Sequence, residues 1–381
     1  MRGTSPASRD YRMLQKHLDH QAIGFPATRS GADLRFLKRM FTPEEARLAL
    51  HLSFRPATFA QIMRTAGEEF AEVRAAEMLE SLVMKGSIGS RNTGEGEAWF
   101  LLPMVVGMFE AQDGRPTKEF LRDAMAYMGT KTYGKSLLAA QPSQMRTIPI
   151  GESVTAEHSV ATYDQVSEII GNASPPFAIL PCICRETAAM RGKSCQVTSR
   201  TETCLAMGSM AATILKRGNG REIGRGEAME IITRNQEEGL VLQPANTRDP
   251  EFICSCCGCC CGMLSIQKML PHPIDFWTAG YIARVDPGRC TGCRACVGRC
   301  QVDAVSLKGS PPRAVVAGTK CIGCGLCVKA CPVDAIGLES RENARTPPRD
   351  YDHLYETIAA NRKGPIRQLA MLLKVLLRMR Q

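Results

Sequence analysis

Residues 289–307 read RCTGCRACVGRCQVDAVSL, and residues 320–338 read KCIGCGLCVKACPVDAIGL. The two segments share four cysteines, one glycine, the Val-Asp-Ala triplet and the final leucine, in the same order. A repeat at this spacing predicts one supersecondary unit that is used twice around a pseudo-twofold axis. In each segment the first three cysteines are three residues apart, so a tight loop can bring three thiolates to one iron–sulfur cluster.

This cysteine pattern resembles the run found in bacterial ferredoxins that bind two [4Fe–4S] clusters. In such folds the fourth ligand of each cluster comes from the other half of the repeat. The resemblance implies that the first cluster is bound by Cys290, Cys293, Cys296 and Cys331. It implies that the second is bound by Cys321, Cys324, Cys327 and Cys300. Gln301 stands where the repeat would place a proline, a departure that removes no ligand. A zinc site is the poorer explanation of the eight cysteines, because zinc normally uses two separated pairs of ligands.

The bulk composition limits the class of protein. The chain has 381 residues, 18 cysteines and a formal net charge of +10, and this length allows about two to four domains. The cysteines are confined to residues 182–331. We find no export signal and no apolar run as long as a membrane span, which predicts a cytoplasmic protein. Clustered cysteines in that compartment favour metal binding over disulfides.

The sequence predicts an α+β multidomain chain with five parts. These are a basic N-terminal arm (1–41), a winged-helix-like domain (42–105), a mixed α/β cysteine-rich domain (106–280), a two-[4Fe–4S] ferredoxin-like module (281–340) and a basic helical tail (341–381). The two ends carry about +5 each. We expect the N-terminal arm to be poorly ordered, with a short helix near Tyr11–Leu18.

Residues 42–105 have the pattern of three helices followed by a hairpin. Thr42-Pro43-Glu44-Glu45 is a helix start, with a cap, a proline at the first position and acidic residues in the first turn. The pattern resembles a winged helix-turn-helix domain, in which the third helix can enter the major groove of DNA. That helix opens with three acidic residues and has only Arg74 as an early basic residue. We therefore favour a protein-interaction role over DNA binding.

The second cysteine region lies within residues 182–261. We predict a buried strand at 177–180 that delivers Cys182 and Cys184 in extended backbone, so that both thiols face the same way. A helix is predicted over 205–215, with Cys204 at its start, and another over 227–238. Six cysteines then occur in eight residues, which is not a packing choice. The ten candidate ligands of this region are Cys182, Cys184, Cys195, Cys204, Cys254, Cys256, Cys257, Cys259, Cys260 and Cys261.

These ten thiols suffice for one or two further Fe–S clusters, a zinc site, or a cubane beside a redox-active pair. Overlapping Cys-x-x-Cys frames leave the ligand sets open. The order of Cys-x-Cys-Arg, two more cysteines, a helix ending in Glu-Gly-Leu-Val, a polycysteine loop and the ferredoxin repeat resembles a family of anaerobe-type 4Fe–4S binding proteins. The resemblance covers residues 160–340 and implies electron transfer with additional metal centres.

The first functional interpretation is an electron-transfer component of an oxidoreductase system, which works with a redox partner protein rather than as a self-contained enzyme. No dinucleotide-binding, Walker or nucleophile-elbow motif is present. One alternative is a redox-sensing winged-helix transcription regulator. Another is an oxidoreductase with its reactive centre in the Cys182–Cys261 region. A basic amphipathic helix over 366–377 would fold back on its own domain, dock on a partner or lie on an anionic membrane surface.

Overall fold

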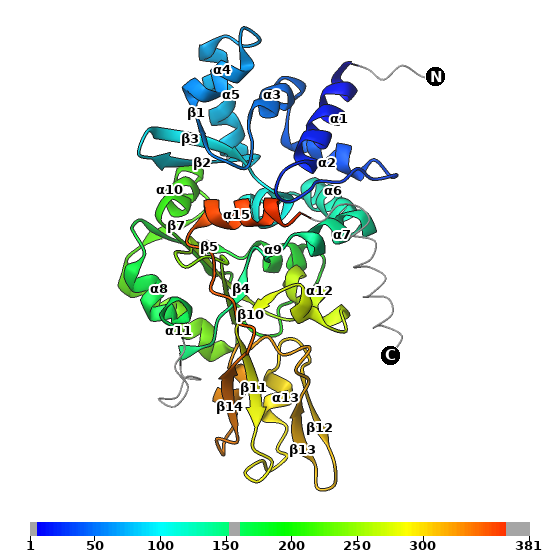
Figure 1. Ribbon diagram of the computed structural model, residues 1–381, viewed down its shortest axis with the longest axis vertical. Coiled ribbons are helices and arrows are strands. Elements are labelled where there is room, and N and C mark those ends of the chain that lie inside the picture. The colour runs from blue at the N-terminus through cyan, green and yellow to red at the C-terminus, as the bar shows by residue number, and fades with distance from the viewer. Residues whose placement is uncertain (1–5, 152–160, 363–381) are drawn as a thin grey trace.

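The computed structural model describes residues 6–151 and 161–362. Along its longest axis the protein has three parts, a mainly helical N-terminal part, a central sheet covered by helices, and a module of four short strands (Figure 1). No helix in these described ranges has the length and apolar character needed to cross a membrane. The described residues form both helices and strands, so the fold is mixed α and β, as predicted.

The N-terminal part contains seven α-helices within the described residues. They are α1 (Pro6–Asp19), α2 (Ala32–Met40), α3 (Pro43–Leu48), α4 (Phe59–Ala66), α5 (Glu72–Lys85), α6 (Lys118–Met128) and α7 (Lys131–Ala139). The antiparallel sheet has the order β1-β3-β2, from β1 (Ala57–Thr58), β2 (Ile88–Thr93) and β3 (Gly96–Leu101). Short turns are η1 (Ala49–His51), η2 (Met104–Met108) and η3 (Glu110–Gln112).

The predicted helix starts are present in this part. The Thr42 hydroxyl accepts from the Glu45 backbone N–H while the Glu45 carboxylate accepts from the Thr42 N–H, which makes a capping box. Thr58 and Gln61 form a second one at the start of α4. Three helices and a hairpin thus follow each other as expected, and the winged-helix interpretation stays a prediction.

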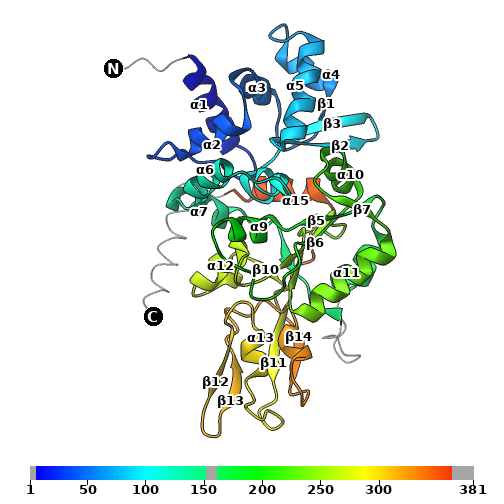
Figure 2. The same ribbon diagram turned by 180° about the vertical axis from the view of Figure 1, so that it is seen from behind.

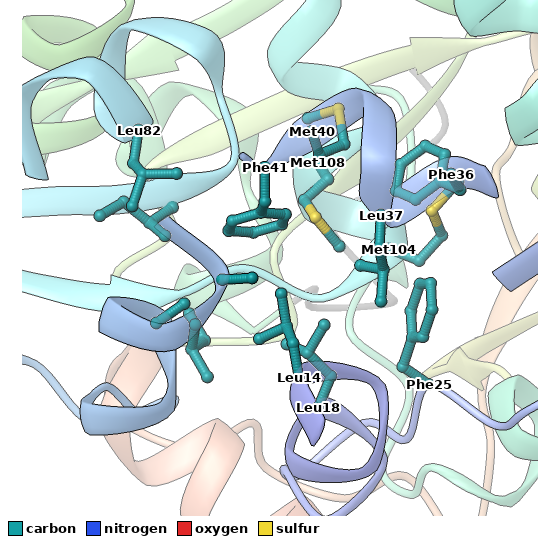
Figure 3. Packing of buried hydrophobic residues seen from close by; sticks show 14 of the residues in the cluster. Leu14, Leu18, Phe25, Phe36, Leu37, Met40, Phe41, Leu82, Met104 and Met108 are labelled. Carbon is teal, nitrogen blue, oxygen red and sulfur yellow. The ribbon is translucent and has the colours of Figure 1, made fainter. Parts of the chain in front are cut away.

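The expectation of a poorly ordered arm is wrong for residues 6–41. Leu14 and Leu18 of α1 and Leu37 of α2 are buried in the same apolar core as Leu82 of α5. Figure 3 shows these side chains pointing into one interior. The apolar residues of α1 recur at helical spacing, but basic residues on its outer face obscure that pattern in the sequence.

The central sheet has five antiparallel strands in the order β7-β5-β6-β9-β8. In chain order they are β5 (Phe177–Pro181), β6 (Glu202–Met207), β7 (Arg221–Ile223), β8 (Val241–Pro244) and β9 (Phe252–Cys256). The helices around it are α8 (Val166–Asn172), α9 (Ile183–Met190), α10 (Gly208–Arg217), α11 (Arg225–Glu238) and α12 (Gly262–Met269). Smaller elements are β4 (Arg146–Thr147), which pairs with β10 (Thr278–Ala279), η5 (Thr162–Asp164) and η6 (Pro273–Asp275).

The two faces of this sheet differ. Ile179, Leu205 and Ile253 point to one face and pack against α8 and α11. Ala178 and Ala206 point to the other face, where they pack against α10. Because successive residues of a strand alternate between faces, this second face also receives the cysteines of the strands.

The last module repeats its backbone as the sequence predicts. Its elements are β11 (Tyr281–Val285), α13 (Ala295–Arg299), β12 (Val305–Lys308), β13 (Arg313–Val316), α14 (Leu326–Lys329) and β14 (Ile336–Ser340). β11 pairs with β14 and β12 pairs with β13, both antiparallel. Equivalent positions share a positive φ, with 72° at Gly292 and 66° at Gly323. A Cβ there would lie 2.4 Å from the carbonyl oxygen of Pro312 or Tyr281, respectively, so both loops require glycine.

The chain then returns to the middle of the molecule. Helix α15 (Tyr351–Ala360) crosses between the N-terminal part and the central sheet (Figures 1 and 2). Leu354, Tyr355 and Ile358 are buried against Ala22, Ile23 and Phe54. This part of the predicted tail is therefore interior structure, whereas the predicted amphipathic helix at 366–377 lies outside the described residues.

Candidate metal centres

The structure brings together the four cysteines expected at the first ferredoxin cluster. These residues are Cys290, Cys293, Cys296 and Cys331, and together they line one small cavity. Leu307 of β12 and Ile336 of β14 also bound this cavity. Cys331 reaches this cavity from the second half of the repeat. The residues present therefore fit a cluster whose fourth ligand comes from the other half.

The second expected set shows the same exchange. Cys300, from the first half, lies near enough to Cys321, Cys324 and Cys327 for its charge to raise the pKa of each of these thiols, after the larger effect of burial. Burial raises the pKa of Cys324 to about 12. Bound metal would overcome this cost, because it holds cysteine as the thiolate.

Backbone N–H groups point at the ligand sulfurs in a symmetric arrangement. The N–H groups of Ala304 and Ala335 donate to the Sγ atoms of Cys300 and Cys331, each with an N···S distance of 3.2 Å. Ala314 and Ala283 donate to Cys290 and Cys321, both at 3.4 Å. Hydrogen bonds of this kind stabilise negative charge on sulfur and adjust the potential of an attached cluster.

Three cysteines of the second region lie on neighbouring strands of the central sheet. Cys204 is in β6, and Cys254 and Cys256 are in β9, so the prediction of a helix start at Cys204 is wrong. Leu205 pairs with Ile253, which places Cys204 opposite Cys254. All three thiols point to the face away from α8 and α11.

Cys182 and Cys184 do not lie in one extended strand, which corrects the geometry predicted for them. Cys182 is the N-cap of α9, and Cys184 is in its first turn. Their thiols are nevertheless neighbours, and the Cys184 side chain is the main cause that lowers the pKa of Cys182. Cys261 is the N-cap of α12, and its thiol contacts that of Cys184.

The other four cysteines form a compact group of their own. Cys257, Cys259 and Cys260 lie in the turn between β9 and α12, and Cys195 lies in the loop after α9. All four Sγ atoms lie within 4.8 Å of one another. Burial alone would raise the pKa of Cys195, but backbone hydrogen bonds and the Cys257 thiol lower it to about 7. We call these four residues the quartet.

Sequence reasoning did not single out three further residues that lie beside these cysteines. Arg185 follows Cys184 directly and is 5% exposed. Its charge interacts with the thiols of Cys182 and Cys204 and with those of Cys195 and Cys257 in the quartet. Glu110 and Asp113 line the cavity next to Cys182. Burial raises the pKa of Glu110 to about 7 and raises the pKa of Asp113 as well. The Cys-x-Cys-Arg motif pointed to the arginine, whereas nothing in the sequence links the two acids to cysteines some 70 residues away.

The ferredoxin-like module is docked directly on the polycysteine turn. The Gly258 N–H donates to Oε1 of Gln301, at 2.8 Å. Cys256 and Cys261 share one apolar cluster with Cys321 and Cys327. Gln301, the residue that departs from the ferredoxin pattern, thus makes a direct contact between the module and the second cysteine region.

Substitution of Gly258 with alanine is expected to loosen this docking. A Cβ at this position would lie 2.3 Å from the backbone oxygen of Gln301, so one of the two backbones must shift. Such overpacking costs about 1–3 kcal/mol of folding free energy. Gly262→Ala is a matched control, since a Cβ there meets nothing within 4 Å. Anaerobic denaturation should distinguish the two variants, and equal stability would contradict the contact.

Comparison with known proteins agrees with the cysteine pattern. Residues 283–338 match one family model described as a 4Fe-4S dicluster domain, and residues 320–360 match a second with the same description. No curated protein and no solved structure matches the chain. The chain therefore contains, in its C-terminal part, a ferredoxin-like 4Fe–4S dicluster domain.

Proposed function

We propose that this protein is an electron-transfer component of an oxidoreductase system, with two [4Fe–4S] clusters in residues 281–340. The observation that carries the proposal is that Cys331 lines the cavity of the first-half cysteines, while Cys300 lies near Cys324 of the second half. A bound [4Fe–4S] cluster accepts and releases one electron at a time. The protein contributes eight thiols, four N–H···S hydrogen bonds and partial exclusion of water.

The contacts of the ferredoxin-like module support an order of the centres along the electron path. Gln301 directly follows Cys300 of the second site and accepts a hydrogen bond from Gly258 in the polycysteine turn, so the second ferredoxin site adjoins the second cysteine region. Cys293, a ligand of the first site, is exposed. We propose that a redox partner protein exchanges electrons at the exposed site and that the second cysteine region lies at the inner end of the path.

A second candidate function is an oxidoreductase with its reactive centre in the Cys182–Cys261 region. A cavity of about 170 Å³ adjoins these thiols, and its other walls include apolar side chains from α10, α15 and the central sheet. Buried cavities of this kind are typical of small-molecule sites. The cavity could admit a small substrate next to a metal centre.

A DNA-binding regulator has less support. Arg74, the early basic residue of α5, forms an ion pair with Glu44, with an N···O distance of 2.6 Å, and another with Glu77. Lys85 at the end of the helix pairs with the buried Glu45. These pairs compensate the positive charge that phosphate contact would need.

The proposed function is tested with the full-length protein, purified anaerobically. The ferredoxin-like module should contribute about eight irons and eight acid-labile sulfides, and stepwise reduction should bleach its visible absorption one electron at a time. A variant with both Cys293→Ser and Cys324→Ser should lose that signal. Zinc in place of iron, or absorption that does not respond to reductant, would contradict the proposal. Reoxidation by small organic acceptors without a partner protein would favour the second candidate.

A further inference from the structure

The ten thiols outside the ferredoxin repeat fall into two spatial groups. The first is the quartet. The second, which we call the ring, consists of Cys182, Cys184, Cys204, Cys254, Cys256 and Cys261. The Arg185 guanidinium lies between the groups, where it acts on Cys182 and Cys204 of the ring and on Cys195 and Cys257 of the quartet. Because the sequence interleaves the two sets, spacing alone does not separate them.

The quartet has the dimensions of a site for a single ion. The Sγ atom of Cys195 lies 3.6 Å from that of Cys257 and 3.7 Å from that of Cys259, and the sulfurs of Cys259 and Cys260 are 3.7 Å apart. Four sulfurs at about 2.3 Å from one tetrahedral ion would be about 3.8 Å from each other. The thiolates of a cubane stand farther apart, because each binds a different iron.

The hydrogen bonds around the quartet fit negatively charged sulfur. The backbone N–H of Gln196 donates to Sγ of Cys259, at 3.4 Å. Arg200 holds the loop that carries Cys195 onto α11 through hydrogen bonds to Glu238 and Asn235. Ligands supported by such contacts keep their orientation when metal binds.

The ring has a different geometry. Its thiols are neighbours in a closed order, in which each influences the pKa of the next; the order is Cys182, Cys184, Cys261, Cys256, Cys254, Cys204 and back to Cys182. Among the described residues, the quartet is the one group of three or more metal-ligand side chains whose ligand atoms all lie within 4.8 Å of one another. The ring thiols are therefore spread around a perimeter, where one ion could not reach three of them.

The six thiols of the ring surround a cavity. All six of its thiols line the cavity of about 170 Å³, as do Cys257 and Cys260 of the quartet, and a single water occupies only about 10–15 Å³. Asp113, which is 7% exposed, and Arg185 line the same cavity. Oδ1 of Asp113 and Nε of Arg185 are buried without a hydrogen-bond partner. Buried unpartnered polar atoms are rare, and here they indicate that a polar group belongs in the cavity.

The charge of Arg185 also points to anionic metal sites. Its guanidinium donates to the hydroxyl of Thr203 and to the carbonyl oxygen of Ser255, and both acceptors are neutral. No carboxylate in the described ranges forms an ion pair with Arg185. A buried cation needs compensating charge. Thiolates supply it when metal has displaced their protons.

We infer that the ten cysteines form two metal centres of different nuclearity, a mononuclear tetrathiolate site in the quartet and a polynuclear iron–sulfur cluster held by the ring. Four thiolates in a tetrahedron select Zn²⁺ or iron. Six thiolates exceed the four that a cubane needs, so the ring fits a cluster larger than a single cubane. This inference deepens the proposed function, since it names the centres that adjoin the ferredoxin-like module.

The experiment measures iron, zinc and acid-labile sulfide per chain in the full-length protein and two variants. The quartet variant, Cys195→Ser with Cys259→Ser, should lose about one metal ion and no sulfide. The ring variant, Cys204→Ser with Cys254→Ser, should lose more than four irons together with their sulfide. Both variants should keep about eight irons in the ferredoxin-like module.

The contrary outcomes are distinct from failure of the proposed function. Loss of sulfide from the quartet variant, or loss of one ion or none from the ring variant, would overturn the inference. Absence of the ferredoxin irons in every form would instead contradict the proposed function. Should either variant fail to fold, X-ray absorption at the zinc edge and Mössbauer spectra of the unmodified protein test whether the quartet binds a single ion. One zinc with four sulfurs at about 2.3 Å, or one iron whose Mössbauer signal is that of a mononuclear tetrathiolate site rather than a cluster, supports the inference. The absence of both refutes it.

Discussion

Replacement of Cys331 with serine is expected to remove about four irons and four sulfides from the protein, although Cys331 belongs to the second half of the repeat. The reason is that its thiol lines the cavity formed by Cys290, Cys293 and Cys296 of the first half. The cluster with Cys321 among its ligands should remain. Iron and sulfide analysis of the anaerobically purified variant measures the loss.

Double variants provide the control for this exchange. Cys331→Ser combined with Cys290→Ser should lose no more iron than Cys331→Ser alone, because both thiols serve the same centre. Cys331→Ser combined with Cys321→Ser should lose about eight irons. The reverse pattern would show that each half binds its own cluster with its own four cysteines, and the predicted exchange of ligands would be wrong.

Replacement of Arg146 with alanine should lower the free energy of unfolding by about 3–5 kcal/mol, the usual cost of breaking a buried ion pair. Arg146 is 2% exposed, and its Nε donates to Asp164 at 2.8 Å. It also donates to the carbonyl oxygens of Tyr163 and Thr247, each at 2.6 Å. The substitution leaves Asp164 buried without its cation.

An exposed ion pair provides the matched control. Arg221 pairs with Glu227 at an N···O distance of 2.9 Å, and both side chains are about half exposed. Exposed pairs contribute little to stability, so Arg221→Ala should leave the denaturation midpoint unchanged. Equal effects in the two variants, measured anaerobically at the same metal content, would show that the Arg146 network does not hold the central part together.

The ferredoxin-like module could be predicted because its information is local. The loop that carries Cys290, Cys293 and Cys296 is fixed by their spacing and by Gly292, and the repeat supplies the second loop. The comparisons confirm a 4Fe–4S dicluster domain there. The ligand exchange came from the resemblance, and the structure brings together the residues that it requires.

The second cysteine region could not be resolved in the same way. Its grouping depends on strand order, since Cys204 meets Cys254 only because β6 and β9 are neighbours. The rule that residues two apart share a face was applied to Cys182 and Cys184, where a helix begins. It holds instead for Cys254 and Cys256, which lie in β9. Sequence spacing does not show where a strand ends and a turn begins.

Helix α15 has a consequence for the order in which the protein can be assembled. Tyr351, Leu354 and Tyr355 of this helix form part of the wall of the thiol-lined cavity, yet the ribosome makes them after every cysteine of the chain. A nascent chain that ends before residue 351 therefore has all of its thiols but lacks this wall. The cavity is therefore complete on this side only after α15 has been made and has packed.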